Sequence, residues 1–239
     1  VAHVLGRDAQ ELSHLAYRVD ERGSWHFKLL DHDLGQHCKT ALRLHQPALC
    51  PQCVSELRYI DAFWDLRAAV ACPAHERKAL RRCHECGDDI RWLRSGLLTC
   101  HCGACFLDAP CDQVDDQTVE LMNVLQAKLH GFPVKSGFPL EALHELPLRS
   151  LIHVLHVLGT QSLWSRRALE ADDQSVVAAA VDALVRWPRG YHRFLKDFGT
   201  RAISANPCAL GYSKQFGTFC EAMFNSRALT GNTEFFKEE

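Results

Sequence analysis

The chain has 239 residues, a formal net charge of -2 and a hydrophobic content of 47%. Its length suits one large domain or two to three small ones, and no apolar run is long enough to cross a membrane, so the composition predicts a soluble globular protein without a membrane partner. The near-neutral charge excludes a polycation that coats nucleic acid indiscriminately, while leaving room for a local basic face.

Residues 1–46 are predicted to be the end of an N-terminal helical domain. Val1 is not an initiator methionine and no signal peptide follows it, so we expect a fragment of a longer protein that lacks parts of both ends. Residues 9–17 and 34–44 are expected to form short helices. Between them, residues 23–27 are expected to form a turn followed by a short extended segment.

Residues 47–112 carry four short Cys/His motifs that are typical of metal-binding knuckles. They read Cys50-Pro-Gln-Cys53, Cys72-Pro-Ala-His75, Cys83-His-Glu-Cys86 and Cys100-His-Cys102. Each motif presents two donors from one tight turn, and two such turns close a tetrahedral site around zinc. Four successive motifs therefore predict a tandem zinc-finger region with two structural zinc ions.

The simplest pairing of these motifs is sequential. The first site then consists of Cys50, Cys53, Cys72 and His75, and the second of Cys83, Cys86, Cys100 and Cys102. An interleaved pairing also satisfies the spacing, and Cys105 could replace Cys100 beside Cys102. Gly87 and Gly103 directly follow Cys86 and Cys102, which favours Cys100, because glycine lets such a turn close with backbone N–H groups facing the sulfur.

Both predicted sites have four protein ligands, whereas a catalytic zinc keeps one position open for water. The signatures of nucleobase deaminases and of H-E-x-x-H metalloproteases do not occur in the sequence. Cys50 and Cys53 also lack the strand–helix alternation that surrounds a thioredoxin-like redox pair. We therefore predict that the protein is not an enzyme, and that its cysteines are metal thiolates in a reducing cytosol.

Residues 113–239 are predicted to form a C-terminal helical domain. Helices are expected over residues 119–129, 147–158, 174–187, 188–198 and 214–227. Gly159 and Gly199 are expected just past helix ends, and residues 131–139 as a linker. Because short helices with tight turns allow helix-turn-helix packing, the predicted fold class is mainly α, with small zinc-ribbon or zinc-finger β elements between helical domains of helix-turn-helix type.

Two groups of basic residues are candidate contacts to nucleic acid or to a partner protein. They are Arg77, Lys78, Arg81 and Arg82 in the zinc region, and Arg186, Arg189, Arg193 and Lys196 further on. Ordinary solvated charge is the alternative interpretation of either group. His153 and His156 are one helical turn apart but have no third ligand nearby, so we expect them to have a structural role.

The order of these motifs resembles that of the TniQ family. The matching residues are Cys50-Pro-Gln-Cys53, Trp64, Cys72-Pro-Ala-His75 and the run from Cys83 to Cys86-Gly87, with the approach from Arg43 to Leu49. Further on, Arg186-Trp-Pro-Arg-Gly-Tyr-His-Arg-Phe194 is similar to the W-P-x-x-aromatic-H segment that opens a helix in that family. The resemblance extends over residues 43–200.

The resemblance implies a target-selection protein of bacterial cut-and-paste transposition, like the TnsD proteins, located in the bacterial cytoplasm. Proteins of this family are not transposases. They recognise a specific DNA site or a CRISPR Cascade complex with its guide RNA, and they recruit the AAA+ regulator TnsC. The resemblance also implies helix-turn-helix segments and a homodimer. Two other hypotheses are a zinc-ribbon nucleic-acid or protein interaction module outside transposition, and a metalloenzyme with an open zinc position.

Overall fold

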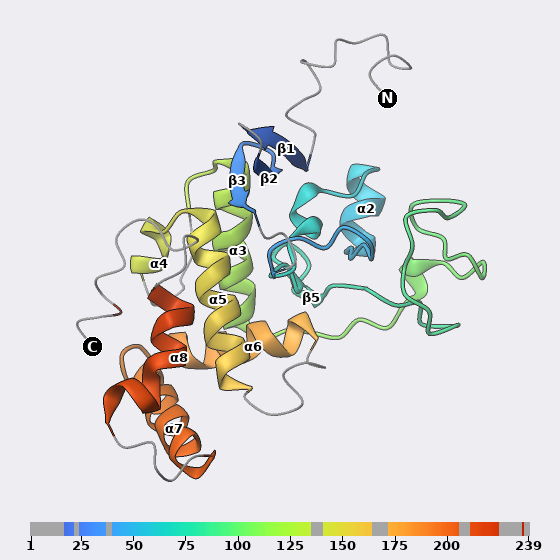
Figure 1. Ribbon diagram of the computed structural model, residues 1–239. Helices are drawn as coiled ribbons and strands as arrows, with labels where there is room; N and C mark the ends of the chain where they lie inside the picture. The colour runs from blue at the N-terminus through green and yellow to red at the C-terminus, as the bar shows by residue number, and fades with distance from the viewer. Residues whose placement is uncertain are drawn as a thin grey trace.

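The computed structural model describes residues 17–21, 24–36, 40–134, 141–163, 172–205, 211–224 and 236. Within these ranges the chain forms seven α-helices and two small antiparallel sheets, and about half of the protein is helical. Figure 1 shows the helices gathered together, with the N-terminal sheet and the Cys/His region beside them. The predicted combination of helices with small β elements is therefore confirmed at this level. The helix expected over residues 9–17 lies outside the described residues apart from Tyr17.

The N-terminal sheet contradicts one predicted helix. Its three antiparallel strands follow the order β1 (Arg18–Glu21), β2 (Ser24–Leu29) and β3 (His32–Gly35), which confirms the extended segment expected after residue 23. The helix expected over residues 34–44 is wrong, because residues 34 and 35 belong to β3 and Leu42 forms a β-bridge with Leu66. Leu34 and Leu42 are both buried, but they lie in a strand and in a β-bridge. Their spacing is nevertheless the same as that of apolar residues on one face of a helix, which explains the wrong prediction.

The Cys/His region consists of short elements separated by turns. In chain order they are α2 (Pro51–Leu57), the 3-10 helix η3 (Ala62–Asp65), the hairpin strands β4 (Ala71–Cys72) and β5 (Arg77–Lys78), and the 3-10 helix η4 (Phe106–Asp108). Helix α2 begins at Pro51, whose fixed φ suits a first helical position, and it ends where Arg58 adopts a left-handed conformation with φ 65°. Helices this short are not stable alone, so other constraints must hold the region together.

Six helices make up most of the described chain after residue 112. They are α3 (Asp116–His130), α4 (Ala142–Glu145), α5 (Leu148–Ser162), α6 (Asp173–Val185), α7 (Arg189–Ala205) and α8 (Tyr212–Phe224). The five helices predicted here are confirmed, with shifted ends. Asp115 caps α3 by accepting a hydrogen bond from the Thr118 N–H, and Gly131 ends it with φ 70°. None of the described helices combines the length and apolarity that crossing a membrane requires.

The sequence predicts Gly159 and Gly199 just past helix ends, and this prediction is wrong. Gly159 lies inside α5 and Gly199 lies inside α7. A Cβ added to Gly159 of α5 would lie 2.1 Å from the carbonyl oxygen of Val176 in α6. A Cβ added to Gly199 of α7 would lie 2.9 Å from the ring of Phe216 in α8. Both glycines therefore permit close helix–helix approach, and this packing outweighs the low helix propensity of glycine.

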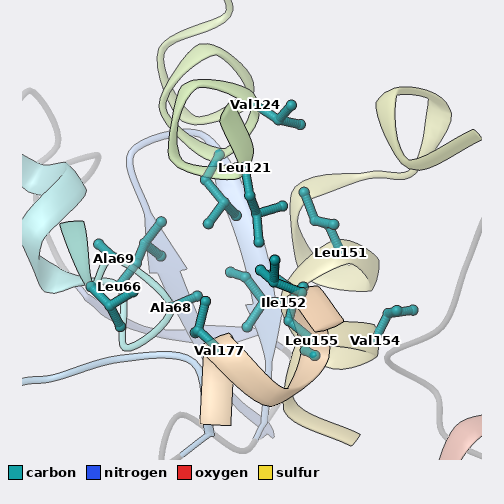
Figure 2. Close-up of a cluster of buried hydrophobic side chains, with 14 of the residues drawn as sticks. Leu66, Ala68, Ala69, Leu121, Val124, Leu151, Ile152, Val154, Leu155 and Val177 are labelled. Carbon is teal, nitrogen blue, oxygen red and sulfur yellow. The ribbon is translucent and has the colours of Figure 1, made fainter. Parts of the chain in front are cut away.

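The main hydrophobic core joins the helices to the start of the Cys/His region. Figure 2 shows Leu66, Ala68 and Ala69, which follow η3, beside buried side chains of α3, α5 and α6. The same buried cluster includes Cys50 and Cys72. The core therefore continues across residues 46 and 112, where the sequence places domain boundaries.

A second, smaller core lies further along the Cys/His region. It contains Leu49, Val54, Cys83, Ile90, Cys100 and Phe106. The loops after β5 that carry most of it project away from the helices in Figure 1. Because two of its six buried members are cysteines, the stability of these loops depends on what the cysteines bind.

Candidate metal centres

The first cluster consists of Cys50, Cys53, Cys72 and His75, and two local structures bring these residues together. Cys50 is the N-cap residue of α2 and Cys53 lies in the first turn, so this pair projects from the start of a helix. Cys72 ends β4, and His75 lies in the turn before β5. Since β4 pairs directly with β5, that turn is tight and presents the second pair of donors.

The donor atoms of the first cluster lie at the separations of a tetrahedral metal site. Cys53 Sγ is 3.3 Å from Cys72 Sγ and from His75 Nδ1, and Cys50 Sγ is 3.6 Å from His75 Nδ1. Donors about 2.0–2.3 Å from a central ion such as zinc would be about 3.3–3.8 Å apart at tetrahedral angles. A disulfide between Cys53 and Cys72 is excluded, because its sulfurs would be about 2.05 Å apart. The cluster therefore fits one tetrahedral ion.

Glu56 is a further residue of the first cluster that the motifs do not predict. Its Oε1 lies 3.0 Å from His75 Nε2, the ring nitrogen that does not face the sulfurs. A carboxylate at this position selects the tautomer that presents Nδ1 to a metal and makes the imidazole a stronger donor. The sequence does contain a signal, since Glu56 follows Cys53 by three residues on α2 and therefore lies on the same helical face.

The thiols of the first cluster strongly affect one another's ionisation. Hydrogen bonds with Cys53 and Cys72 lower the pKa of Cys50, whereas hydrogen bonds with Cys50 and Cys72, together with burial, raise the pKa of Cys53 well above its usual range. Thiolates at such short distances repel one another, and a divalent cation between them cancels the repulsion. The electrostatics of the cluster therefore suit a metal–thiolate site.

The second cluster consists of Cys83, Cys86, Cys100 and Cys102, supplied by two similar turns. Gly87 has φ 73° and donates its N–H to the Cys83 carbonyl, while Gly103 has φ 95° and donates to the Cys100 carbonyl. No atom lies within 4 Å of a Cβ added to either glycine, so the left-handed backbone is what requires glycine there. Both glycines thus mark the turns that the sequence predicts.

Backbone N–H groups favour the thiolate form at Cys83. Burial raises the pKa of this thiol, but hydrogen bonds from the N–H groups of Cys86 and Glu85, together with those of the Cys100 and Cys102 thiols, lower it to about 7. This is the arrangement expected of a metal-binding turn, in which backbone N–H groups point at the sulfur.

Donor separations in the second cluster also match a tetrahedron. Cys83 Sγ is 3.7 Å from Cys102 Sγ, and Cys86 Sγ is 3.8 Å from Cys100 Sγ. Four thiolates about 2.3 Å from one ion would be about 3.8 Å apart. Cys105 precedes η4 and is not among the grouped donors, so Cys100 and not Cys105 accompanies Cys102. The structure therefore groups the eight donors sequentially and not in the interleaved order.

The remaining cysteines form no third centre within the described part of the chain. Cys86, Asp88 and His101 also lie close together, but this set shares Cys86 with the second cluster. Cys105, Cys111 and Cys220 form no disulfide. The other two cysteines, at positions 38 and 208, lie outside the described residues.

Arg77 does not have the role that the sequence predicts for it. Its side chain is buried at 2% exposure, and its guanidinium donates to Gln52 Oε1 and to the Pro110 carbonyl. The prediction that Arg77 contacts nucleic acid or a partner is therefore wrong, because the side chain is buried and both its Nη1 and its Nη2 groups donate inside the fold.

The other basic residues of this region form ion pairs at or near the surface. Lys78 Nζ lies 3.5 Å from Asp112, and Arg82 Nε lies 3.1 Å from Asp89. Such exposed pairs contribute little stability. Arg81 is half-buried and lies 3.7 Å from Asp173, at the edge of a cavity.

The second basic group surrounds the start of α7. Arg186, Arg189, Arg193 and Lys196 are all exposed. In contrast, Trp187 stacks on Tyr191 with ring centroids 4.9 Å apart, and Tyr191 is almost fully buried. The aromatic residues of the W-P segment therefore pack in the core, while its basic residues face solvent.

His153 makes a structural contact of the kind that the sequence predicts. His153 Nε2 lies 3.0 Å from the Ala222 carbonyl oxygen and so links α5 to α8. Burial lowers the pKa of the His153 and His156 imidazoles, which favours their neutral forms. Among the described residues, no set of grouped metal donors includes either histidine.

Comparison with known proteins assigns no family. No protein-family model matches the chain, and no curated protein matches it. The fold and the sites themselves define a largely helical protein with two Cys/His clusters, each of which can hold a metal ion.

Proposed function

We propose that both clusters bind zinc and that the two ions are structural. Four sulfur or nitrogen donors in a tetrahedral arrangement are typical of zinc. In each cluster the four donor atoms lie within 4.8 Å of one another, so a bound ion would have a full set of protein ligands and no open position for a substrate. The ions would then act as cross-links between short elements that cannot fold alone.

We propose further that the protein is a non-catalytic target-selection adaptor of bacterial DNA transposition. The observation that carries this proposal is the order of the two clusters, followed by the Trp187-Pro188 segment directly before α7, which resembles the order in TniQ proteins. In this role the protein links a target, either a specific DNA site or a CRISPR Cascade complex with guide RNA, to the AAA+ regulator TnsC. It would act as a homodimer in the bacterial cytoplasm.

Helices α6 and α7 are the best candidates for the helix-turn-helix unit of this adaptor. Three residues join them, a turn length typical of that motif. The two helices pack closely, because a Cβ added to Gly190 would lie 2.6 Å from the Ala183 carbonyl oxygen. In such a unit the first turns of the second helix face the DNA. Arg189 and Arg193 occupy those turns and are exposed.

The metal assignment is tested by the zinc content of purified variants. We expect two zinc ions per chain in the unaltered protein, and one in Cys53→Ser and in Cys86→Ser, each with a lower melting temperature because the released metal no longer holds its turns. Cys111→Ser is the matched control, since Cys111 is exposed and outside both clusters. Two ions retained in both ligand variants would contradict the ligand assignment.

The helix-turn-helix assignment is tested by charge reversal on α7. Arg189→Glu and Arg193→Glu should each weaken binding to duplex DNA about tenfold or more at low salt, because each turns a phosphate contact into a repulsion. Lys214→Glu makes the same charge change at an exposed position of α8. Equal losses in all three variants would indicate general electrostatics and not recognition by α7.

The adaptor role is tested by its partners. Genes for a transposase and an AAA+ regulator beside this gene would support it, and neighbouring Cascade genes with a CRISPR array would indicate CRISPR-directed targeting. The decisive measurement is binding of the zinc-loaded protein to the AAA+ regulator from the same locus. Intact zinc sites without any such binding would favour an interaction module outside transposition.

A further inference from the structure

A cavity of about 330 Å³ lies between the first metal-cluster region and the start of α6. Three arginines, Arg43, Arg67 and Arg81, line it, and they come from three separate segments of the chain. Asp173, the first residue of α6, is the only acid among the described residues of the lining. The cavity is therefore unusually rich in guanidinium groups for its size.

Asp173 neutralises these arginines only in part. It accepts hydrogen bonds from Arg43 at 3.0 Å and from Arg67 at 2.6 and 2.8 Å, while Arg81 stays 3.7 Å away. The side chains of Arg43 and Asp173 are only 5% and 8% exposed, so water screens the charges of this pair weakly. Among the described residues that line the cavity, three guanidinium groups and one carboxylate give a formal charge of +2.

Two further features favour an anion there. The N-terminus of α6 adds the positive end of a helix dipole to the same wall. Arg43 is buried at 6% exposure, and its Nε has no hydrogen-bond partner among the described residues. The pKa of Arg43 is lowered by burial and by the charges of Arg81 and Arg67, although Asp173 opposes this. An anion in the cavity would relieve the repulsion among the three arginines.

We propose that this cavity is a binding site for a phosphate group. A phosphate carries up to two negative charges and presents oxygens in three dimensions, which suits guanidinium groups that approach from separate segments. A carboxylate ligand would be planar and would carry a single charge, and the carboxylate of Asp173 already occupies such a position beside the arginines. Arg67 and Arg81 are 43% and 34% exposed, so a ligand can reach them from solvent. The site is independent of the transposition role and of both metal clusters.

The neighbouring arginines Arg81 and Arg82 provide a matched pair of variants. Arg81 lines the cavity, whereas Arg82 pairs with Asp89 and does not. In calorimetric titration of the zinc-loaded protein with inorganic phosphate, Arg81→Gln should weaken binding about tenfold or more, the loss expected for a charged hydrogen bond. Arg82→Gln removes the same charge and should change the affinity less than twofold. Chloride at equal ionic strength is the reference.

Nucleic acid and free phosphate are two sources of the same group, and duplex DNA separates them. If the phosphate belongs to a nucleic acid, Arg81→Gln lowers DNA affinity and reduces its salt dependence by about one ion, and Arg82→Gln does so less. If both variants bind DNA equally while only Arg81→Gln loses inorganic phosphate, the ligand is a free phosphate compound. Either result supports the site.

Four results would overturn the proposal. The first is no phosphate binding by the unaltered protein, and the second is equal weakening by both variants. The third is polyglutamate that binds as tightly as phosphate and depends equally on Arg81, which would identify an acidic protein surface as the ligand. The fourth is a lower melting temperature of Arg81→Gln without phosphate but an unchanged phosphate-dependent shift, which would identify a purely structural Arg81.

Discussion

Replacing Gly159 by alanine is predicted to destabilise the protein, although alanine is the better helix former. Gly159 lies within α5, where it faces the backbone of α6. The added Cβ would lie 2.1 Å from the Val176 carbonyl oxygen and 2.7 Å from the Val176 Cγ1. A main-chain carbonyl cannot rotate away as a flexible side chain can, so the helices themselves must move.

The size of the effect follows from the separation that the contact requires. Real Cβ atoms essentially never lie within 3.0 Å of another group, so α5 and α6 must part locally by about 1 Å. Overpacking of this kind costs about 1–3 kcal/mol and occasionally more. The helix propensity of alanine returns about 1 kcal/mol. Because the contact is with a backbone atom, we expect a cost at the upper end of this range, and therefore a net loss of about 2 kcal/mol.

Gly217→Ala in α8 is the matched control. The chemical change is the same, but no atom lies within 4 Å of the added Cβ, so this variant should be unchanged or stabilised by up to about 1 kcal/mol. Urea denaturation followed by far-ultraviolet circular dichroism measures both free energies of unfolding. If Gly159→Ala proved as stable as Gly217→Ala, the close approach of α5 and α6 would be refuted.

Three further predictions concern charged groups. Glu56→Gln should weaken metal binding at the first cluster about 10–100-fold in chelator competition, because His75 loses its carboxylate partner, whereas Glu76→Gln should not. Burial raises the pKa of Asp65 from 3.8 to about 6, so its ionised form opposes folding. Asp65→Asn should therefore add about 3 kcal/mol to the free energy of unfolding above pH 6, and this gain should shrink as the pH falls toward 4. A gain that does not depend on pH would contradict this account. Asp173→Asn should lower the free energy of unfolding by about 3–5 kcal/mol in denaturant titration, because buried Arg43 loses its carboxylate partner. Asp172→Asn is the control, because asparagine still caps α6 and stability should change little. Similar losses of stability in the two variants would refute the arginine network.

The metal donors are predictable from sequence because each pair is a local structure. Cys83 and Cys86 lie in one turn, and Gly87 makes that turn possible by its left-handed backbone. The same holds for Cys100, Cys102 and Gly103 in the other half of the cluster. The helices after residue 112 are predictable for a related reason, since apolar spacing and caps such as Asp115 act within a few residues.

The failed predictions concern residues whose partners are distant in the chain. Leu34 is buried in β3, and it would be buried equally on the inner face of a helix. The spacing of apolar residues around Leu34 therefore could not distinguish a strand from a helix. Gly159 resembles a helix end until α6 is placed against it. Arg77 resembles a surface cation until Pro110, far along the chain, accepts its hydrogen bond.

The sequence by itself therefore determined which atoms can bind metal, because tight turns and their glycines are set by neighbouring residues. Only the tertiary structure decided how those turns pair, and that Glu56 supports His75. It alone also brings Arg43 to Asp173, 130 residues away, and so creates a charged cavity that no local pattern predicts. The physical reason is that burial and charge balance depend on which distant segments the core brings together. The spacing of residues along the sequence reflects only interactions between residues that are close in the chain.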